Sequence, residues 1–217
     1  MRKFLTLLLI AIVTGNLTHA QIKKGAVLLG GQVAVEQIDT HGGVNLQSNQ
    51  KNNAAVFNIS IGKAIKENTV WGIKAGYGSN KNKVTTGANS ATNQNKFYNL
   101  GLFYRKYKNL SNNFYFFGEA GAGYYGITQT STDNTGNNNS KNTLSALQLS
   151  LTPGIAYQVC NKLQLEILLP NMVIAQYGVS KNTIQNKVVS KSDQFQFSTN
   201  LNGSPFNALA FAFRLIL

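Results

Sequence analysis

After residue 20, eight segments alternate between apolar and small or polar residues with a period of two, which is the period of a β-strand. Polar stretches rich in Asn, Ser, Thr, Gln and Lys separate them, and none shows a convincing helical period. We therefore expect an all-β protein of eight antiparallel strands. The segments are residues 26–36, 54–65, 69–78, 97–107, 114–127, 143–158, 163–176 and a last one within 194–217, most clearly 206–217.

The connections between these segments alternate strictly in length. Long connections cover residues 37–53, 79–95, 128–142 and 177–193, and short ones cover 66–68, 108–113 and 159–162. Because neighbouring strands are antiparallel, the four long connections lie at one end of the sheet and the three short ones at the other. Outer-membrane barrels have short periplasmic turns and long extracellular loops. The sequence predicts an eight-stranded, up-and-down transmembrane β-barrel of this kind.

The two faces of each segment support this prediction. In residues 69–78, for example, Trp71, Ile73 and Tyr77 share one face, and Lys74 lies on the other among glycines. A narrow barrel lumen suits small residues with a few large polar ones. We expect aromatic residues at the strand ends to form girdles at the membrane interfaces, namely Trp71, Tyr77, Tyr98, Tyr107, Phe114, Phe116, Tyr124 and Tyr125.

Residues 1–20 have the pattern of a cleaved signal peptide. Arg2 and Lys3 precede an apolar stretch at residues 4–13, and the small residues of 18–20 provide a cleavage site before Gln21. A membrane-spanning helix needs about 20 apolar residues, and Asn16 interrupts this stretch earlier. We expect export to the cell outer membrane and one barrel domain, residues 21–217.

Most charged residues inside the strands have a common parity, whereas Lys63 and Lys106 have the apolar parity and lie at strand ends next to short turns. A charge that faces lipid at mid-depth costs about 2–4 kcal/mol, and six charged residues lie on the face opposite the apolar one. We expect them to form a lumen charge network, in which Glu166 can pair with Arg214 and Arg105 with Glu119. Two interpretations are open, a charged gate or proton path and a set of ion pairs that plugs the lumen. The six residues are Glu36, Lys74, Arg105, Glu119, Glu166 and Arg214.

The overall charge limits the partners. Without Arg2 and Lys3, 18 bases stand against 7 acids, a net charge of +11. The bases are scattered and the chain is exported, which excludes nucleic acid as a partner. Outer-membrane lipid and lipopolysaccharide are the expected anionic partners, and an extracellular partner is not identified by the sequence. The lysines of the long connections are expected to make these contacts, namely Lys51, Lys81, Lys83, Lys141, Lys181, Lys187 and Lys191.

Residues for catalysis or metal binding are sparse. His41 is the one histidine of the mature chain, and it has Asp39 and Ser48 nearby. A triad is recognised by geometry, and a metal site needs a larger cluster of ligands. We expect no enzyme activity, no metal and no cofactor. The single cysteine, Cys160, cannot form an intramolecular disulfide.

Several stretches carry a resemblance to a known family: the Ala20-Gln21 junction and residues 25–31, 100–107, 116–124 and 151–157. On these, the chain resembles the small outer-membrane β-barrel family common in Bacteroidetes, with the architecture of the OmpA, OmpX and OmpW type. The resemblance implies the fold, a Gram-negative outer-membrane location and the barrel assembly machinery as a partner during biogenesis. The chain departs from the family's terminal aromatic residue by ending on Leu217.

Taken together, these features predict a non-enzymatic outer-membrane barrel with an envelope structural or surface-interaction role. One alternative is a narrow porin-like channel or a route for small hydrophobic solutes. A second is a lipid-modifying barrel enzyme that uses His41.

Overall fold

The computed structural model describes residues 22–41, 48–86, 89–133, 140–184, 187–199 and 209–217, except for the side chains of 34–41, 48 and 89. Within these residues no helix is long and apolar enough to cross a membrane. Ten strands form one antiparallel sheet. They are β1 (Val27–His41), β2 (Ser48–Lys66), β3 (Thr69–Thr86), β4 (Asn89–Ser111), β5 (Phe114–Asp133), β6 (Ser140–Cys160), β7 (Leu163–Leu168), β8 (Val173–Ile184), β9 (Lys187–Thr199) and β10 (Ala210–Ile216).

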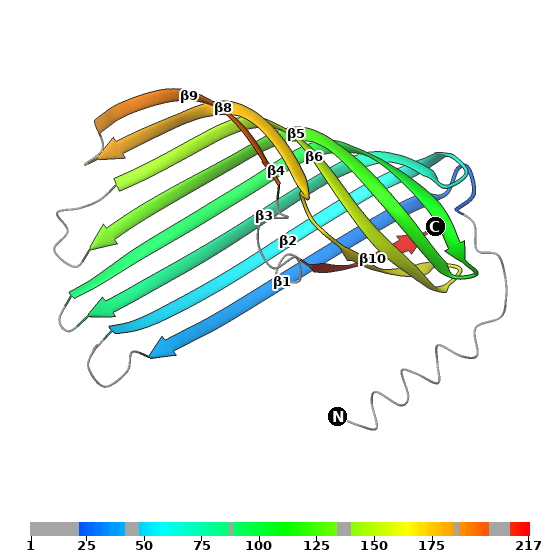
Figure 1. Cartoon of the computed structure of the whole chain (residues 1–217), viewed down its shortest axis with the longest axis horizontal. Helices are drawn as coiled ribbons and strands as arrows, with labels where there is room; N and C mark the ends of the chain where they lie inside the picture. Colours follow the sequence, from blue (N-terminus) through cyan, green and yellow to red (C-terminus); the bar gives the residue numbers. More distant parts are fainter. Residues whose placement is uncertain (1–21, 42–47, 87–88, 134–139, 185–186, 200–208) are drawn as a thin grey trace.

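The strand pairings form a closed ring. Consecutive strands from β1 to β7 pair with one another, and β10 pairs with both β7 and β1. β8 pairs with the other part of β6, and β9 pairs with β8. Figure 1 shows β1 to β6 as long strands that run side by side, with β8 and β9 continuing the sheet beside them.

The count of ten strands differs from the expected eight because two predicted segments are divided. The predicted strand 163–176 is wrong as a single element: β7 ends at Leu168 and β8 begins at Val173. Pro170 has no N–H to donate to a ladder, and Asn171 has a φ of 52°, which a strand does not accept. The predicted last segment, 194–217, likewise contains the end of β9 and all of β10.

The expected long connections are also wrong over most of their length. Residues 79–86 continue β3 and residues 89–95 continue β4, in unbroken register from Tyr77↔Tyr98 to Thr86↔Asn89. The same holds for most of 37–53, 128–142 and 177–193. Where both faces of a sheet are polar, no alternation marks the strand in the sequence, and the register set by the apolar part extends along the pair.

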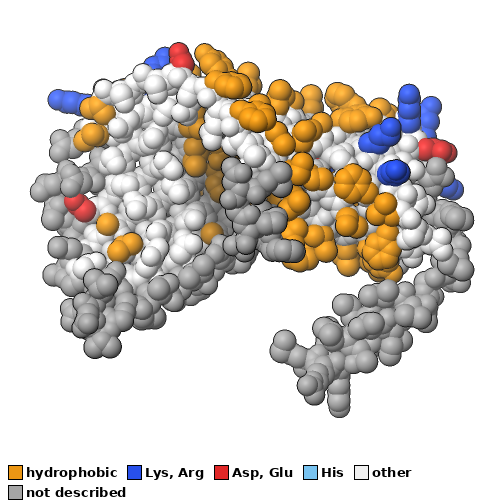
Figure 2. Space-filling model, in the orientation of Figure 1, with side chains coloured by type: hydrophobic (Ala, Val, Ile, Leu, Met, Phe, Trp, Pro, Cys, Tyr) orange, Lys and Arg blue, Asp and Glu red, His pale blue; other side chains and the backbone are white. Residues whose placement is uncertain are grey.

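An apolar belt covers the outside of the sheet. Figure 2 shows hydrophobic side chains in a broad band across one half of the molecule and few of them over the described part of the other half. Leu102 and Leu149, in this belt, are 50% and 61% exposed. Trp71 lies against Tyr104 near the turn end of the belt, and Tyr98 lies against Tyr124 at the other end.

Two residues expected in the aromatic girdles face the interior instead. Tyr107 is buried, and its ring packs on Phe117. Tyr125 lines an internal cavity. Their parity is opposite to that of Tyr104 and Tyr124, so the period of two excludes them from the outer face.

An apolar cluster fills the interior near the two-residue turns that join β2 to β3, β4 to β5 and β6 to β7. Residue 22 enters this cluster from outside the strands, because the backbone of Ile22 exchanges hydrogen bonds with Asn68. The buried members are Ile22, Leu28, Ala64, Val70, Phe103, Tyr107, Tyr115, Phe117, Ala156 and Leu168.

Candidate functional site: a charged floor beneath a polar cavity

Five of the six predicted charged residues form one continuous chain of ion pairs. Lys74 Nζ lies 2.9 Å from Glu119 Oε1, and Glu119 Oε2 accepts from Arg105 at 2.7 Å. Arg105 Nη1 also donates to Glu166 Oε1 at 2.7 Å, and the same oxygen accepts from Arg214 Nε at 2.7 Å. The chain therefore joins strands β3, β5, β4, β7 and β10 across the inside of the ring.

Each buried carboxylate in this chain lies between two cations. Glu119 bridges Lys74 and Arg105, and Glu166 bridges Arg105 and Arg214. The guanidinium of Arg105 also lies 4.1 Å from the centre of the Phe117 ring, a cation–π distance. Such pairing offsets part of the cost of removing charges from water.

The two pairs expected from the sequence, Glu166 with Arg214 and Arg105 with Glu119, are both present. The contact of Arg105 with Glu166 was not expected from the sequence. The two residues are 61 positions apart, and their strands are not neighbours in the sheet. The sixth residue, Glu36, lies on β1 opposite Ala54, and its side chain is outside the described part of the structure.

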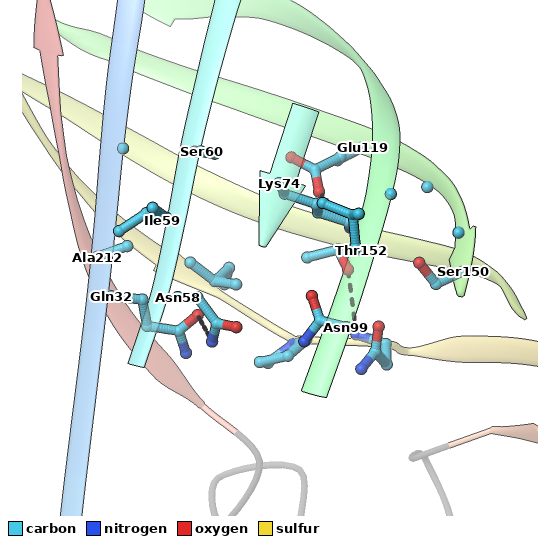
Figure 3. A pocket seen from close by; sticks show the side chains of 18 of the residues that line it. Gln32, Asn58, Ile59, Ser60, Lys74, Asn99, Glu119, Ser150, Thr152 and Ala212 are labelled. Atoms are coloured by element: carbon cyan, nitrogen blue, oxygen red, sulfur yellow. Dashed lines mark hydrogen bonds and ion pairs between the residues drawn. The ribbon is translucent and has the colours of Figure 1, made fainter. Parts of the chain in front are cut away.

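A cavity of 460 Å³ lies on one side of the ion-pair chain. All five charged residues line it, whereas Leu168 is its only lining residue among the buried members of the apolar cluster. The ion pairs therefore form the floor of the cavity, and the apolar cluster lies behind them. Figure 3 shows Lys74 beside Glu119 here, with Asn58 and Asn99 nearby.

Amide side chains form a collar around this cavity, which we define as Gln32, Asn58, Asn99 and Gln148. Asn58 donates to Gln32 at 3.3 Å. Sequence reasoning singled out only charged residues and missed this collar. The parity used for the charges would have found it, because Asn58 shares the inward face of β2 with Ser60, and Asn99 shares that of β4 with Arg105.

Bare glycine backbone provides much of the space. A Cβ on Gly121 would lie 2.7 Å from Lys74 Nζ and 2.8 Å from Ser150 Oγ. A Cβ on Gly101 would lie 2.6 Å from the carbonyl oxygen of Ala122 on the neighbouring strand. Side chains at these positions would displace the lysine or separate the strands, so the cavity depends on their absence.

Within the part of the chain that the structure describes, no group of three or more His, Cys, Asp or Glu side chains is placed to hold a metal. His41 is the last residue of β1. The side chains of His41, Asp39 and Ser48 lie outside the described set, so the geometry of that alternative stays untested.

The structural likenesses found for this chain are distant. A major outer membrane protein from Thermus thermophilus is 15% identical, with a TM-score of 0.44, over 88% of this chain and 99% of that one. The translocator domain of autotransporter NalP from Neisseria meningitidis is 11% identical, with a TM-score of 0.33, over 99% of this chain and 94% of that one. No curated protein matches.

A family model, in contrast, matches most of the sequence. The model of the outer membrane protein beta-barrel domain matches residues 5–200. This match confirms the outer-membrane β-barrel family that the resemblance implied and, with it, the outer membrane as the location. The chain belongs to the outer membrane protein beta-barrel domain family.

Proposed function

We propose that the chain is an eight-segment transmembrane barrel, exported by a signal peptide, whose lumen is blocked to general diffusion and whose role is structural or surface-interacting. The count of eight rests on the pairings. β7 and β8 pair with successive parts of β6. On their other side, β7 pairs with β10 and β8 pairs with β9. The ten strands therefore occupy eight positions around the wall.

The observation that carries the blocked lumen is the ion-pair floor with the apolar cluster behind it. Glu166 is 1% exposed and Arg105 4% exposed, so the centre of the floor has almost no surface open to water. The rings of Phe117 and Tyr107 pack 5.7 Å apart beneath it. Eight-stranded lumens are just wide enough to be filled by side chains. This arrangement supports the ion-pair plug over the gate and speaks against a porin-like channel.

Planar-bilayer recording of the refolded mature chain tests the blocked lumen. We expect no steady ion conductance from the wild type. Glu119→Ala removes one bridging carboxylate but leaves the apolar cluster, so we expect it to stay silent too. Steady conductance in the wild type would overturn the proposal. A conductance that appears only in Glu119→Ala would favour the gate.

The surface-interaction part of the proposal rests on lysines beyond the belt. Lys51 and Lys83 are direct partners across β2 and β3, and both are exposed. Like charges directly opposite each other destabilise a sheet. Lys81 shares their outer face and follows Tyr77 by four residues, about 13 Å along the strand. Asp39 is opposite Lys51 on β1, with its side chain outside the described set.

The outer face of β2 and β3 beyond Tyr77 suits the phosphate groups of lipopolysaccharide, which would neutralise Lys51 and Lys83. Lys51→Gln, Lys81→Gln and Lys83→Gln combined should weaken co-migration with lipopolysaccharide at low salt, where exposed charges are least screened. The matched control replaces Lys63, Lys106 and Lys108 with Gln; these are exposed but lie near the short turns. Equal loss in both triple variants, or loss in neither, would contradict a specific contact.

One observation favours a second candidate, a lateral route for small hydrophobic solutes. Among the described residues, β1 pairs with β10 from Leu28 to Gln32, and Val27 exchanges backbone hydrogen bonds with Leu217. From Val33 to His41, the described pairings of β1 are with β2 alone. Uptake of a small apolar dye into vesicles that contain the protein would support this route. Uptake equal to that of empty vesicles would remove it.

A further inference from the structure

The cavity above the ion-pair floor has the size and the lining of a ligand site. Its 460 Å³ lies within the range of about 300–1,000 Å³ typical of small-molecule pockets. The proposed function requires only a plug, and a plug alone would not need an internal space of this size. The small residues that create the space, including Gly30, Gly101, Gly121 and Gly123, all line it.

The floor of this cavity carries an excess of positive charge. The charged lining residues are three cations and two carboxylates, and the chain of ion pairs ends in a cation on both sides. Arg214, at one end, is 3% exposed and is occupied by Glu166 and Ser60. Lys74, at the other end, keeps 27% of its side chain exposed. A charged cleft with low-dielectric walls concentrates ions of the opposite sign.

The collar supplies hydrogen-bonding groups at a defined distance from Lys74. Asn58, Gly76 and Asn99 are in register across β2, β3 and β4. A Cβ on Gly76 would clash with Asn58 Oδ1 and would lie 2.6 Å from Asn99 Nδ2, so both amides lean over the bare glycine. Gly76 is two residues from Lys74, which is about 7 Å along the strand.

Two collar residues have unused hydrogen-bonding capacity. Within the described residues, the side-chain amides of Asn99 and Gln148 have no hydrogen-bond partner, although both line the cavity. An amide both donates and accepts, which suits the hydroxyl groups of a ligand. The nearby hydroxyl of Ser150 adds a further group on the same wall.

We propose that the cavity binds a small hydroxylated molecule that carries one carboxylate or phosphate group, with the anion at Lys74 and the hydroxyls at the amide collar. Such a ligand would neutralise the excess charge of the floor and satisfy the free amides. The separation of about 7 Å fits a chain of a few carbons between the anion and its hydroxyls. The proposal rests on the blocked floor, which makes this cavity a blind cup instead of a passage.

Calorimetry on the full mature chain, refolded in uncharged detergent at low salt, tests the proposal. The probes are gluconate for a carboxylate, glycerol 3-phosphate for a phosphate, inorganic phosphate for a bare anion, and glucose for a neutral polyol. We expect saturable one-to-one binding of gluconate or glycerol 3-phosphate. Glucose should bind at least about tenfold more weakly, a difference of ~1.4 kcal/mol.

Two variants assign the two parts of the site. Lys74→Gln should weaken the anionic probe about tenfold and remove its advantage over glucose. The matched control is Lys96→Gln on the exposed outside of β4, which should change nothing. Asn99→Leu should weaken gluconate or glycerol 3-phosphate without affecting inorganic phosphate. Heat-modifiable migration verifies that each variant is folded.

Three results would overturn the proposal. They are no saturable heat from either anionic polyol up to about 10 mM, equal binding by Lys74→Gln, or binding of glucose as tight as that of gluconate. Conductance is measured on the same samples. Steady conductance would remove the blocked lumen whatever the probes do, whereas silent protein that binds no probe would remove only the ligand site.

Discussion

The half of the sheet near the short turns and the half beyond the apolar belt share strands β2 to β6 but differ in what their two faces meet. Near the turns, β4 presents Leu102 outward and buries Phe103 and Arg105. Further along, the same strand has polar residues on both faces, as at Thr92 and Asn93. The first half is fixed by side chains on both faces, and the second by backbone pairing and register.

A charge has a different cost in each half. Inside the first half, charges are tolerated because each carboxylate is held between two cations. In the second half, two exposed lysines can lie directly opposite each other. Substitutions in the two halves should therefore differ strongly in their effect on the free energy of unfolding.

The largest effect is expected where one substitution leaves Arg214 without an ion-pair partner and Arg105 with Glu119 alone. Glu166→Gln removes the charge that joins Arg105 to Arg214, and breaking a buried pair in this way costs about 3–5 kcal/mol. Urea unfolding of the refolded protein in detergent measures the loss. Asp193→Asn, on the exposed strand β9, is the control and should change little. A loss below about 0.5 kcal/mol in Glu166→Gln would mean that the ion pairs do not stabilise the fold.

The next largest difference between the two halves is expected when a charge is placed on the outer face. Leu102→Arg puts a cation in the middle of the belt, where lipid exposure costs about 2–4 kcal/mol. Thr132→Arg puts the same side chain on an exposed outer position of β5 beyond the belt, where we expect a change within about 0.5 kcal/mol. Unfolding in phospholipid vesicles compares the two. Equal losses would show that the belt does not mark the membrane.

The glycines of the inner face give a smaller effect. Gly101→Val forces side-chain atoms against the backbone of β5, and overpacking of this kind costs about 1–3 kcal/mol. Gly118→Ala is the matched control, because a Cβ there meets nothing within 4 Å. The same urea titration measures both. If Gly101→Val were as stable as the control, the close approach of β4 and β5 would not be required for the fold.

The smallest effect is expected beyond the belt. In detergent free of lipopolysaccharide, Lys83→Gln relieves the repulsion with Lys51 and should raise the free energy of unfolding by about 0.2–1 kcal/mol. Lys108→Gln, exposed near a short turn and opposite Phe116, should leave it unchanged. The gain should disappear when lipopolysaccharide is added, because phosphate then neutralises both lysines. A gain that persists would count against the proposed contact.

The sequence predicted much of the first half and little of the second. Where one face meets an apolar surrounding and the other a packed lumen, alternation identifies the strand and places Lys74, Arg105 and Glu119 on one face. Beyond the belt both faces are polar, so residues 79–86 and 89–95 were predicted as a connection and are strands. Pro170 was a visible sign of the break between β7 and β8 that the prediction of a single strand overlooked.

The sequence by itself determined the all-β class, the family and the inward parity of the charged residues, because each depends on a period of two along one strand. The tertiary structure decided the rest. It brought Arg105 to Glu166 across strands that are not neighbours, divided two expected strands, and left a cavity above the ion-pair floor. These features depend on which strands face each other across the ring and on where bare glycines leave space. The periodicity along a single strand specifies neither of them.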